Sequence, residues 1–412
     1  MSVVEWFFWL SIVLVLYPYL IYPMGIGLIA ILKRREQKDV ETDEIDYWPD
    51  VTIIIPAYRE AQSVAPKMES IRNLDYPKDK LRILWIIATH EGDDSLEPTL
   101  KALQSYPEAL YILVPHRGKI YSLNQARLQV ETPYTLITDA DILISPHSLR
   151  VGIQHMKQNP RVVLVGGSRQ LLPQGKNTPV GFSEAPYLGY EAWLGKAESQ
   201  WGCALGLGGG FLLLRTSFWP EMPAGVVDDL YLNLYAGLNR FHVVFEPKIK
   251  SYEIPSASYR VEFQRKIRIA YTAFNTIRSL FSWKKALQNP LFLFFFFSHK
   301  LFRYTIAPVA LLIGLLSVVG VAFKSTFYSM AATLYILAAL EAFALWALAT
   351  VRLPGWIALP GYFFLAHFAQ LVGLWKFLRS EDPLRVWQRL PRTEIGMSHA
   401  VEHNYSTGSS TS

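Results

Sequence analysis

An uncharged apolar run near the N-terminus constrains this chain more than any other feature. It covers residues 6–32 and exceeds the roughly 20 residues that a helix needs to cross a bilayer. It is also too long for the core of a signal peptide. Lys33, Arg34 and Arg35 follow directly, and cationic residues favour the cytosolic side of a span. We therefore predict a transmembrane helix within residues 1–35 that ends in the cytosol, with burial in a soluble core as the alternative.

The C-terminal third contains three more apolar blocks of near-spanning length, over 304–323, 327–350 and 356–375. They predict a membrane region of helices over residues 286–380. The segment 290–304 that precedes the first block contains charged side chains. We predict that this segment is interfacial or re-entrant.

These spans leave a conflict about the side of the membrane on which the chain ends. One N-terminal span and three later ones would bring the C-terminus back outside. The cationic residues after the last block favour the inside instead: Lys376, Arg379, Arg385, Arg389 and Arg392. Either one block does not cross fully, or the polar tail, predicted to be partly disordered over 381–412, lies outside.

Charge and cysteine content narrow the possible functions. The formal net charge of +6 suits a protein that lies on anionic lipid, and no nucleic-acid recognition motif accompanies it. We therefore expect the lipid bilayer, and no nucleic acid, as a partner. Cys203 is the single cysteine, which excludes an internal disulfide and fits a reducing compartment. We expect an integral protein of the cytoplasmic membrane whose soluble part faces the cytosol, with its oligomeric state open.

Residues 46–285, between the two membrane regions, alternate between strand and helix patterns. Short apolar runs that predict strands are separated by stretches with helical spacing, and the runs lie at 51–56, 82–87, 110–115, 134–141 and 161–168. This order predicts an α/β domain with a mostly parallel sheet and helices on both faces. Ligands of such sheets bind beyond the carboxyl ends of the strands.

Two carboxylates, Asp139 and Asp141, end the fourth predicted strand in "YTLITDADILISP". In an extended chain residues i and i+2 share a face, so both side chains can point to one place. Carboxylates together with diphosphate oxygens and water suit Mg²⁺ or Mn²⁺. A cation site is therefore one interpretation, and a solvated loop tip is the other.

With the Asp-x-Asp segment and the motifs around it, the domain resembles a membrane-integrated, inverting family 2 glycosyltransferase of the GT-A (nucleotide-diphospho-sugar transferase) fold. This class is related to the cellulose, hyaluronan and chitin synthases. The likeness covers about 51–268, and the motifs occur in the family's order. It implies a GT-A domain flanked by transmembrane helices, a nucleotide-sugar donor with UDP preferred, Mg²⁺ or Mn²⁺ as cofactor, and a membrane-associated lipid or glycan acceptor.

The resemblance also implies roles for residues at the donor end. "VTIIIPAYRE" is similar to the family's opening strand and turn, which implies nucleotide contacts by Pro56, Ala57, Tyr58 and Glu60. "IIATHEGDD" and "RGKIYSLNQA" resemble later donor segments. They imply that Glu91, with Asp93 as second choice, binds the base or ribose, and that Lys119 and Asn124 lie near the diphosphate. "TDADI" resembles the metal-binding Asp-x-Asp, so Asp139 would contact nucleotide and metal, and Asp141 the metal.

At the acceptor end, "LGLGGGF" resembles a small-residue loop beside the acceptor, which implies roles for Gly208, Gly209 and Gly210. "VVDDLYLNLYAGL" resembles the acidic motif at the start of a helix, with Asp228 near the acceptor and Asp229 as catalytic base. An inverting transfer needs one carboxylate to take the proton of the acceptor hydroxyl. The alternative for both acids is stabilisation of the helix N-terminus.

The last motif departs from the family pattern. Processive synthases carry Gln-x-x-Arg-Trp where this chain has Arg265 to Ile269 in "EFQRKIRIAYTAF". Arg265 and Arg268 remain candidates for diphosphate contacts. The missing aromatic residue favours a transferase that adds few sugars over a processive synthase that extrudes its polymer. The segment 259–285 is also amphipathic and predicts an interfacial helix.

Other functions remain as alternatives. A nucleotidyl- or phosphotransferase would use the same metal pair, but the chain has no P-loop or kinase signature. A transporter or receptor would only bind a nucleotide-sugar, and it would not need a separate base such as Asp229. The leading prediction is an inverting hexosyltransferase at the membrane surface.

Overall fold

The structure is a computed structural model, and it describes residues 1–33, 47–172, 175, 178–348, 353 and 355–379. Arg34, Arg35, the first residue of the predicted domain and the predicted tail over 381–412 lie outside these described residues.

A mixed eight-stranded sheet is the centre of the described middle region, in the order β3-β2-β1-β4-β7-β6-β8-β5. The strands β1, β2, β3 and β4 pair in parallel, as do β6 and β8, whereas β7 pairs antiparallel with both β4 and β6. The bounds are β1 Val51–Ala57, β2 Leu81–Thr89, β3 Ala109–Pro115, β4 Tyr134–Ile137, β5 Leu143–Ile144, β6 Val162–Leu171, β7 Leu212–Arg215 and β8 His242–Glu253. The predicted mostly parallel α/β sheet is confirmed.

Helices cover both faces of this sheet, as its apolar runs require. Ile53 and Ile55 of β1 belong to one buried core, with Met68 of α3, and Ile54 belongs to a second core on the other face, with Leu123 of α5. Successive strand residues point to opposite faces, so a run that is apolar throughout is buried on both sides. The helices of the domain are α3 Ala61–Arg72, α4 Leu96–Leu103, α5 Lys119–Arg127, α6 Ser148–Gln158, α8 Pro179–Ser199, α9 Asp228–Leu238 and α10 Tyr259–Leu280. Short 3-10 turns are η3 Lys78–Lys80 and η4 Thr216–Phe218.

One prediction about the strands is wrong. The fourth strand ends at Ile137, so Asp139 and Asp141 lie in the turn that follows and not on an extended chain. In the sheet, β7 lies between β4 and β6. The sequence analysis missed β7, a four-residue strand that follows the glycine-rich segment.

The described residues contain four helical stretches long and apolar enough to cross a membrane, at the four places expected. They are Val3–Ile31, Ile306–Lys324, Thr326–Ala347 and Trp356–Leu378. The first consists of α1 Val3–Leu16, the π-helical η1 Tyr17–Ile21 and most of α2 Tyr22–Lys33. The later elements are α11 Trp283–Leu287, α12 Pro290–Phe295, the π-helical η5 Phe296–Leu301, α13 Phe302–Tyr304, α14 Ile306–Val321, the 3-10 turn η6 Ala322–Lys324, α15 Thr326–Ala347 and α16 Gly355–Leu378.

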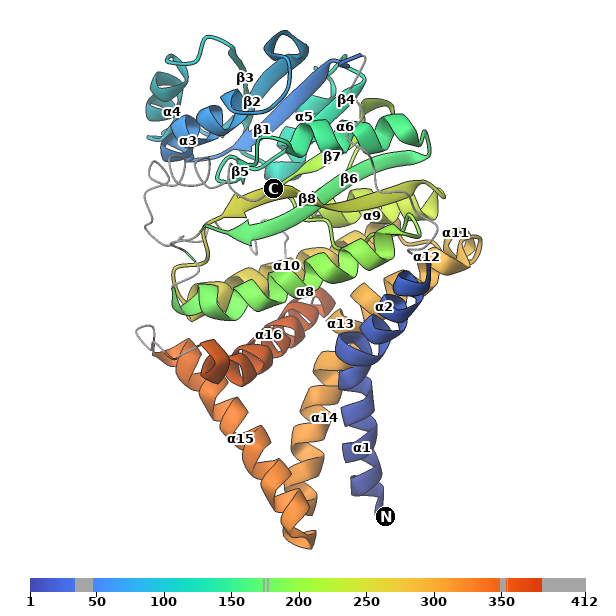
Figure 1. Cartoon of the computed structure of the whole chain (residues 1–412). Coiled ribbons are helices and arrows are strands. Elements are labelled where there is room, and N and C mark those ends of the chain that lie inside the picture. The colour runs from blue at the N-terminus through green and yellow to red at the C-terminus, as the bar shows by residue number, and fades with distance from the viewer. Residues whose placement is uncertain (34–46, 173–174, 176–177, 349–352, 354, 380–412) are drawn as a thin grey trace, which may run out of the picture.

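The helix α16 differs from the other long apolar helices in its position. It packs against α10 and α8 beneath the domain, while α1, α14 and α15 extend away from the domain (Figure 1). The approach of α10 and α16 is close, since a Cβ atom on Gly373 would lie 2.8 Å from the Cβ of Ala270. The predicted interfacial helix over 259–285 is shorter than expected, because α10 ends at Leu280 and Phe281 is extended.

Candidate active site

Lys119 lies at the centre of the predicted site. It is the first residue of α5, directly after Gly118, whose φ of 88° is in the region that favours glycine. Its Nζ lies 2.6 Å from Asp139 Oδ1 and 2.8 Å from Asp228 Oδ2. Burial opposes the charge of the ammonium group, but the two carboxylates outweigh burial and raise the pKa of Lys119. One cation thus joins two acids that are far apart in sequence.

The acids of the Asp-x-Asp segment lie in a turn supported by a buried lysine. The amide of Ile142 donates to the Asp139 carbonyl at 3.3 Å. Below the turn, Lys67 Nζ donates to Thr138 Oγ1 at 2.6 Å and to the Ile142 carbonyl at 2.7 Å. Burial lowers the pKa of Lys67 to about 7, although Asp139 and Asp141 counteract this effect. The sequence analysis missed Lys67, which occurs in an ordinary amphipathic helix pattern.

The candidate base Asp229 lies in the first turn of α9, next to the buried Asp228. Burial and the Asp228 carboxylate raise the pKa of Asp229 from 3.8 to about 6, against the opposing charges of Lys119 and Arg169. A carboxylate with a raised pKa beside a fixed cation has the properties of a general base. The position at a helix N-terminus is also observed, so the two interpretations of this pair are compatible.

The glycine-rich segment closes the site on its other side. A Cβ atom on Gly209 would lie 3.3 Å from Asp139 Oδ2 and 3.6 Å from Lys119 Nζ. A Cβ atom on Gly208 would lie only 2.5 Å from Cδ of Arg169, and one on Gly210 would lie 2.7 Å from the hydroxyl oxygen of Ser251. A Cβ atom at Gly208 or Gly210 would therefore require Arg169 or Ser251 to shift, and one at Gly209 would fit tightly against Asp139.

Arg169, near the end of β6, is a second residue that the sequence analysis missed. Its Nη1 lies 3.7 Å from Glu253 Oε1 at the end of β8, and its charge acts on Asp229. Only the pairing of β6 with β8 brings these two residues together.

A stacked aromatic pair follows the ends of β1 and β3. The Tyr58 and His116 rings are parallel within 9° at 3.8 Å between centroids, and His90 lies 6.1 Å from Tyr58. Below them the Asp93 carboxylate is 2% exposed and accepts hydrogen bonds from the amide and hydroxyl of Ser95. Burial opposes ionisation, but these bonds dominate and lower the pKa of Asp93.

The other predicted donor residues lie in different settings. Glu91 is exposed, and Pro56 and Ala57 form the end of β1. Glu60 accepts a hydrogen bond from the Ser63 hydroxyl at 2.6 Å. Asn124 bonds the backbone of Met222 through both ends of its amide, so it fastens α5 to that loop.

Arg265 and Arg268 lie on α10, and the contacts of Arg265 are internal. Its guanidinium group forms ion pairs with Glu184 of α8 and Glu262 of α10. Its charge is therefore met by two buried carboxylates. Arg268 is half-buried on the same helix.

Asp139 and Asp141 are the residues that the sequence predicts to hold a divalent cation. Across the described part of the chain, no group of three or more His, Cys, Asp or Glu side chains is placed to hold a metal ion. Mg²⁺ is commonly held by one or two carboxylates together with water and substrate phosphates, and Mn²⁺ accepts the same oxygen ligands. A pair of carboxylates therefore fits a cation that arrives with a diphosphate.

Comparisons with known proteins relate the chain to glycosyltransferases. Residues 52–192 match the family described as Glycosyl transferase family 2. The chain is 21% identical over 226 residues to the poly-beta-1,6-N-acetyl-D-glucosamine synthase of Staphylococcus epidermidis, covering 53% of this chain and 51% of that protein. It is 27% identical over 148 residues to cellulose synthase 1 of Komagataeibacter xylinus, covering 34% of this chain and 9% of that protein. The chain thus spans about half the length of the first relative.

A solved structure shares the fold over almost the whole chain. It is the mannosyltransferase PcManGT from Pyrobaculum calidifontis, in complex with GDP-Man and Mn²⁺. Its TM-score is 0.66 at 20% identity, and the match covers 91% of this chain and 100% of that one.

Proposed function

Residues 52–192 are a glycosyl transferase family 2 domain on a GT-A-like fold, and from this premise we propose that the chain moves a sugar from a nucleotide-diphosphate donor to a membrane-associated acceptor. The observation that carries the proposal is the position of Lys119. It contacts Asp139 of the Asp-x-Asp turn and Asp228 beside the candidate base. The charge of Lys119 therefore acts on both the donor end and the acceptor end of the proposed site.

Asp229 acts as the base of the proposed reaction. A pKa of about 6 leaves its carboxylate ionised at neutral pH and still able to accept a proton. It takes the proton of the acceptor hydroxyl as that oxygen bonds to the anomeric carbon. The bond from this carbon to the diphosphate oxygen breaks with inversion, and the nucleoside diphosphate leaves with the electron pair.

Lys119 and the Asp-x-Asp turn serve the leaving group. Lys119 lies where its ammonium group can move from Asp139 to a diphosphate oxygen and offset the growing negative charge. A divalent cation held by Asp139 and Asp141 would supply further neutralisation of the leaving diphosphate. Lys67 holds the turn in place through Thr138 and Ile142.

The nucleoside occupies the edge of the sheet beside β1, β2 and β3. Its base lies against the stacked Tyr58 and His116 rings. Glu91 is an exposed carboxylate at the outer side of this proposed nucleoside site. Both uridine and guanosine donors are to be tested.

The membrane arrangement follows from the position of α16. We place the crossings at residues 3–31, at α14 and at α15, and we place α16 in the cytosolic interface, where it supports α10 and α8. This arrangement keeps the domain in the cytosol. It also puts Lys376 and Arg379 there, as their charge favours.

Labelling of single cysteines tests the arrangement. In a Cys203→Ser background, Arg379→Cys should react with an impermeant maleimide only after the cytosolic side is opened, and Lys324→Cys should react from outside. Labelling of both from the same side would contradict three crossings.

Donor hydrolysis and transfer by the detergent-purified full chain test the function. We expect UDP or GDP release from a nucleotide-sugar with Mn²⁺ or Mg²⁺. Asp229→Asn should lower transfer by about 100-fold or more, in the range of general base catalysis. The matched control is Asp50→Asn at the opposite end of β1, which should leave transfer unchanged. No nucleotide release with any common donor, or full transfer by Asp229→Asn, would contradict the proposal.

Processive synthesis is the second candidate, favoured by the likeness to two polysaccharide synthases. Ile269, where processive members of the class carry the aromatic residue, is partly exposed on α10. Product length on a gel separates the two: addition of one or a few sugars is expected, and a long ladder would favour the synthase.

A further inference from the structure

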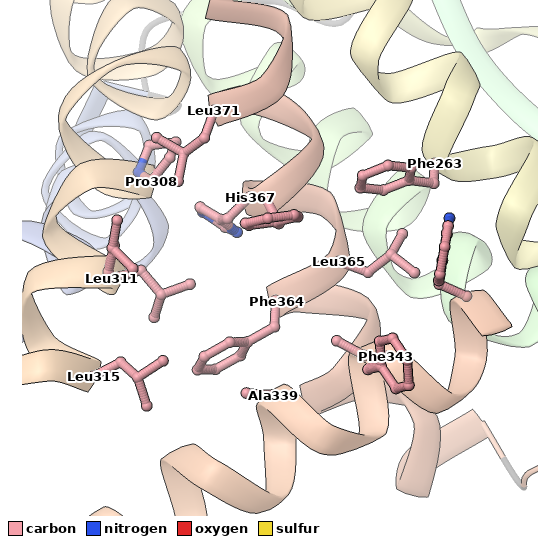
Figure 2. Close-up of a pocket in the computed structure, with 14 residues that line it drawn as sticks. Phe263, Pro308, Leu311, Leu315, Ala339, Phe343, Phe364, Leu365, His367 and Leu371 are labelled. Atoms are coloured by element: carbon pink, nitrogen blue, oxygen red, sulfur yellow. The ribbon is translucent and has the colours of Figure 1, made fainter. Parts of the chain in front are cut away.

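An apolar cavity of about 460 Å³ lies between α10, α14, α15 and α16 (Figure 2). Its walls are aliphatic and aromatic side chains such as Leu311, Ala339 and Phe364, with His367 on α16 adding imidazole nitrogens. The volume is in the range of about 300–1,000 Å³ that is usual for small-molecule sites. Walls of this chemistry do not hold a sugar chain, because its hydroxyl groups would lose their hydrogen bonds.

The cavity opens sideways between the helices. Three of its lining residues, Leu312, Phe343 and Phe368, expose 43%, 62% and 59% of their surface. They belong to three different candidate membrane helices. Leu312 and Phe343 lie on α14 and α15, which we place across the membrane, and Phe368 lies on the interfacial helix α16. The mouth is therefore at the boundary between the hydrocarbon layer and the cytosolic interface, where a lipid chain can enter from the bilayer.

His367 connects this cavity to a polar cluster beneath the domain. It forms a 3.0 Å hydrogen bond between its Nε2 and the hydroxyl of Tyr19, in the π-helical segment η1. The guanidinium group of Arg303 lies over the Tyr19 ring at 5.1 Å and pairs with Glu191 of α8. A second π-helical segment, η5, ends just before Arg303, and such segments are frequent at functional sites.

The glycine-rich segment connects the same cluster to the candidate active site. A Cβ atom on Gly206 would lie 3.7 Å from Glu191 Oε2, and one on Gly209 would lie 3.3 Å from Asp139 Oδ2. Tyr304 packs against the apolar cluster that contains Leu230, the residue after Asp229. A chain of contacts through Tyr19, Arg303 and Glu191 therefore connects His367 in the cavity wall to the glycine-rich segment beside the candidate active site.

We propose that the acceptor is a hydroxylated or sugar-bearing membrane lipid whose hydrocarbon tail occupies this cavity and whose head group lies along residues 206–210, directed to Asp229. This inference rests on the proposed function and names its acceptor class. Tyrosine side chains suit the head group because they present an apolar ring and a polar tip at the membrane surface. The cavity accounts for the tail, which a polymer acceptor does not have.

Photolabelling tests the cavity without any donor. The probe is an alkyl glucoside with a diazirine at the end of its chain, added to the full chain in detergent and competed with unlabelled alkyl glucoside. We expect saturable adducts on Leu311, Phe364 or neighbouring lining residues. Ala339→Trp should fill the cavity and reduce these adducts at least tenfold. Ala347→Trp makes the same substitution at an exposed position on α15 and should leave them unchanged.

Enzyme assays on the same variants complete the test. Ala339→Trp should reduce sugar transfer to the alkyl glucoside at least tenfold while release of nucleoside diphosphate into water persists, and Ala347→Trp should match the wild type in both. Unsaturable labelling confined to outward-facing residues such as Leu316 and Leu340, or normal transfer by Ala339→Trp, overturns the inference. If the wild type releases no nucleotide from any donor, the proposed function fails, and saturable labelling still reports whether the cavity binds a lipid tail.

Discussion

Asp229→Asn should make the protein more stable while it lowers transfer by about 100-fold or more. Burial and Asp228 raise the pKa of Asp229 from 3.8 to about 6, so the folded chain disfavours the ionised carboxylate that the reaction needs. A shift of this size corresponds to about 3 kcal/mol, at about 1.4 kcal/mol per pKa unit. The side chain is only half-buried, and solvent reduces the effect. We therefore expect about 1–2 kcal/mol of stabilisation, because asparagine has nearly the same shape and no charge.

The stability difference between Asp229→Asn and the wild type should depend on pH in a defined direction. The folded state binds more protons than the unfolded state between the two pKa values, so the contribution of Asp229 to stability is lost as pH rises from about 4 through about 6. The stability difference between Asp229→Asn and the wild type should be full at pH 7 and should vanish near pH 4. Thermal unfolding of both proteins in one detergent, at several pH values, measures it.

Activity should follow the same ionisation in the wild type. At pH 5 about one tenth of the Asp229 carboxylates are ionised if the pKa is near 6, so kcat/KM should fall about tenfold between pH 7 and pH 5. Asp228→Asn removes a neighbouring negative charge and should lower the pKa of Asp229. The fall of kcat/KM on the acidic side of the pH profile should then occur at lower pH. A lower melting temperature of Asp229→Asn at pH 7, or a flat profile down to pH 5, would refute the reasoning.

Three further predictions concern the support of the site. Lys119→Met removes a cation that lowers the pKa of Asp229, so the acidic limb of residual activity should move to higher pH; a shift to lower pH would contradict this electrostatic role. Burial lowers the pKa of Lys67 from 10.5 to about 7. The free energy of unfolding of the wild type should therefore rise between pH 7 and pH 10, and that of Lys67→Met should not rise. Gly209→Ala places a methyl group 3.3 Å from a carboxylate oxygen of the acid turn and should reduce donor hydrolysis several-fold, whereas Gly189→Ala, where no atom lies within 4 Å, should not; equal activity of the two variants would show that the close approach has no role.

Some parts of the fold are readable from local sequence because local physics determines them. The run at β1 is apolar on both faces, and a strand of this kind must be buried between two layers. The segments 3–31 and Thr326–Ala347 are identified by length and composition alone. The helix α6, Ser148–Gln158, is also readable from the sequence, because its apolar spacing is helical throughout.

Other parts depend on partners that are distant in sequence. Nothing in the Leu212–Arg215 run predicts that β7 inserts antiparallel between β4 and β6, since the pairing of strands is a property of the whole sheet. Lys67 reads as a solvated helix residue, and only the packing of α3 under the acid turn makes it a buried donor. Arg265 reads as a phosphate-binding residue, and the structure gives it two buried carboxylates.

The sequence by itself determined which chemical groups the chain has and in which local elements they lie. It identified Asp139 and Asp229 as candidates because their motifs are local. Only the tertiary structure decided that Lys119 contacts both Asp139 and Asp228, and that α16 lies beneath the domain and closes an apolar cavity. The reason is physical: charges and apolar walls act over a few ångströms, and only folding brings residues a hundred or more positions apart within that distance.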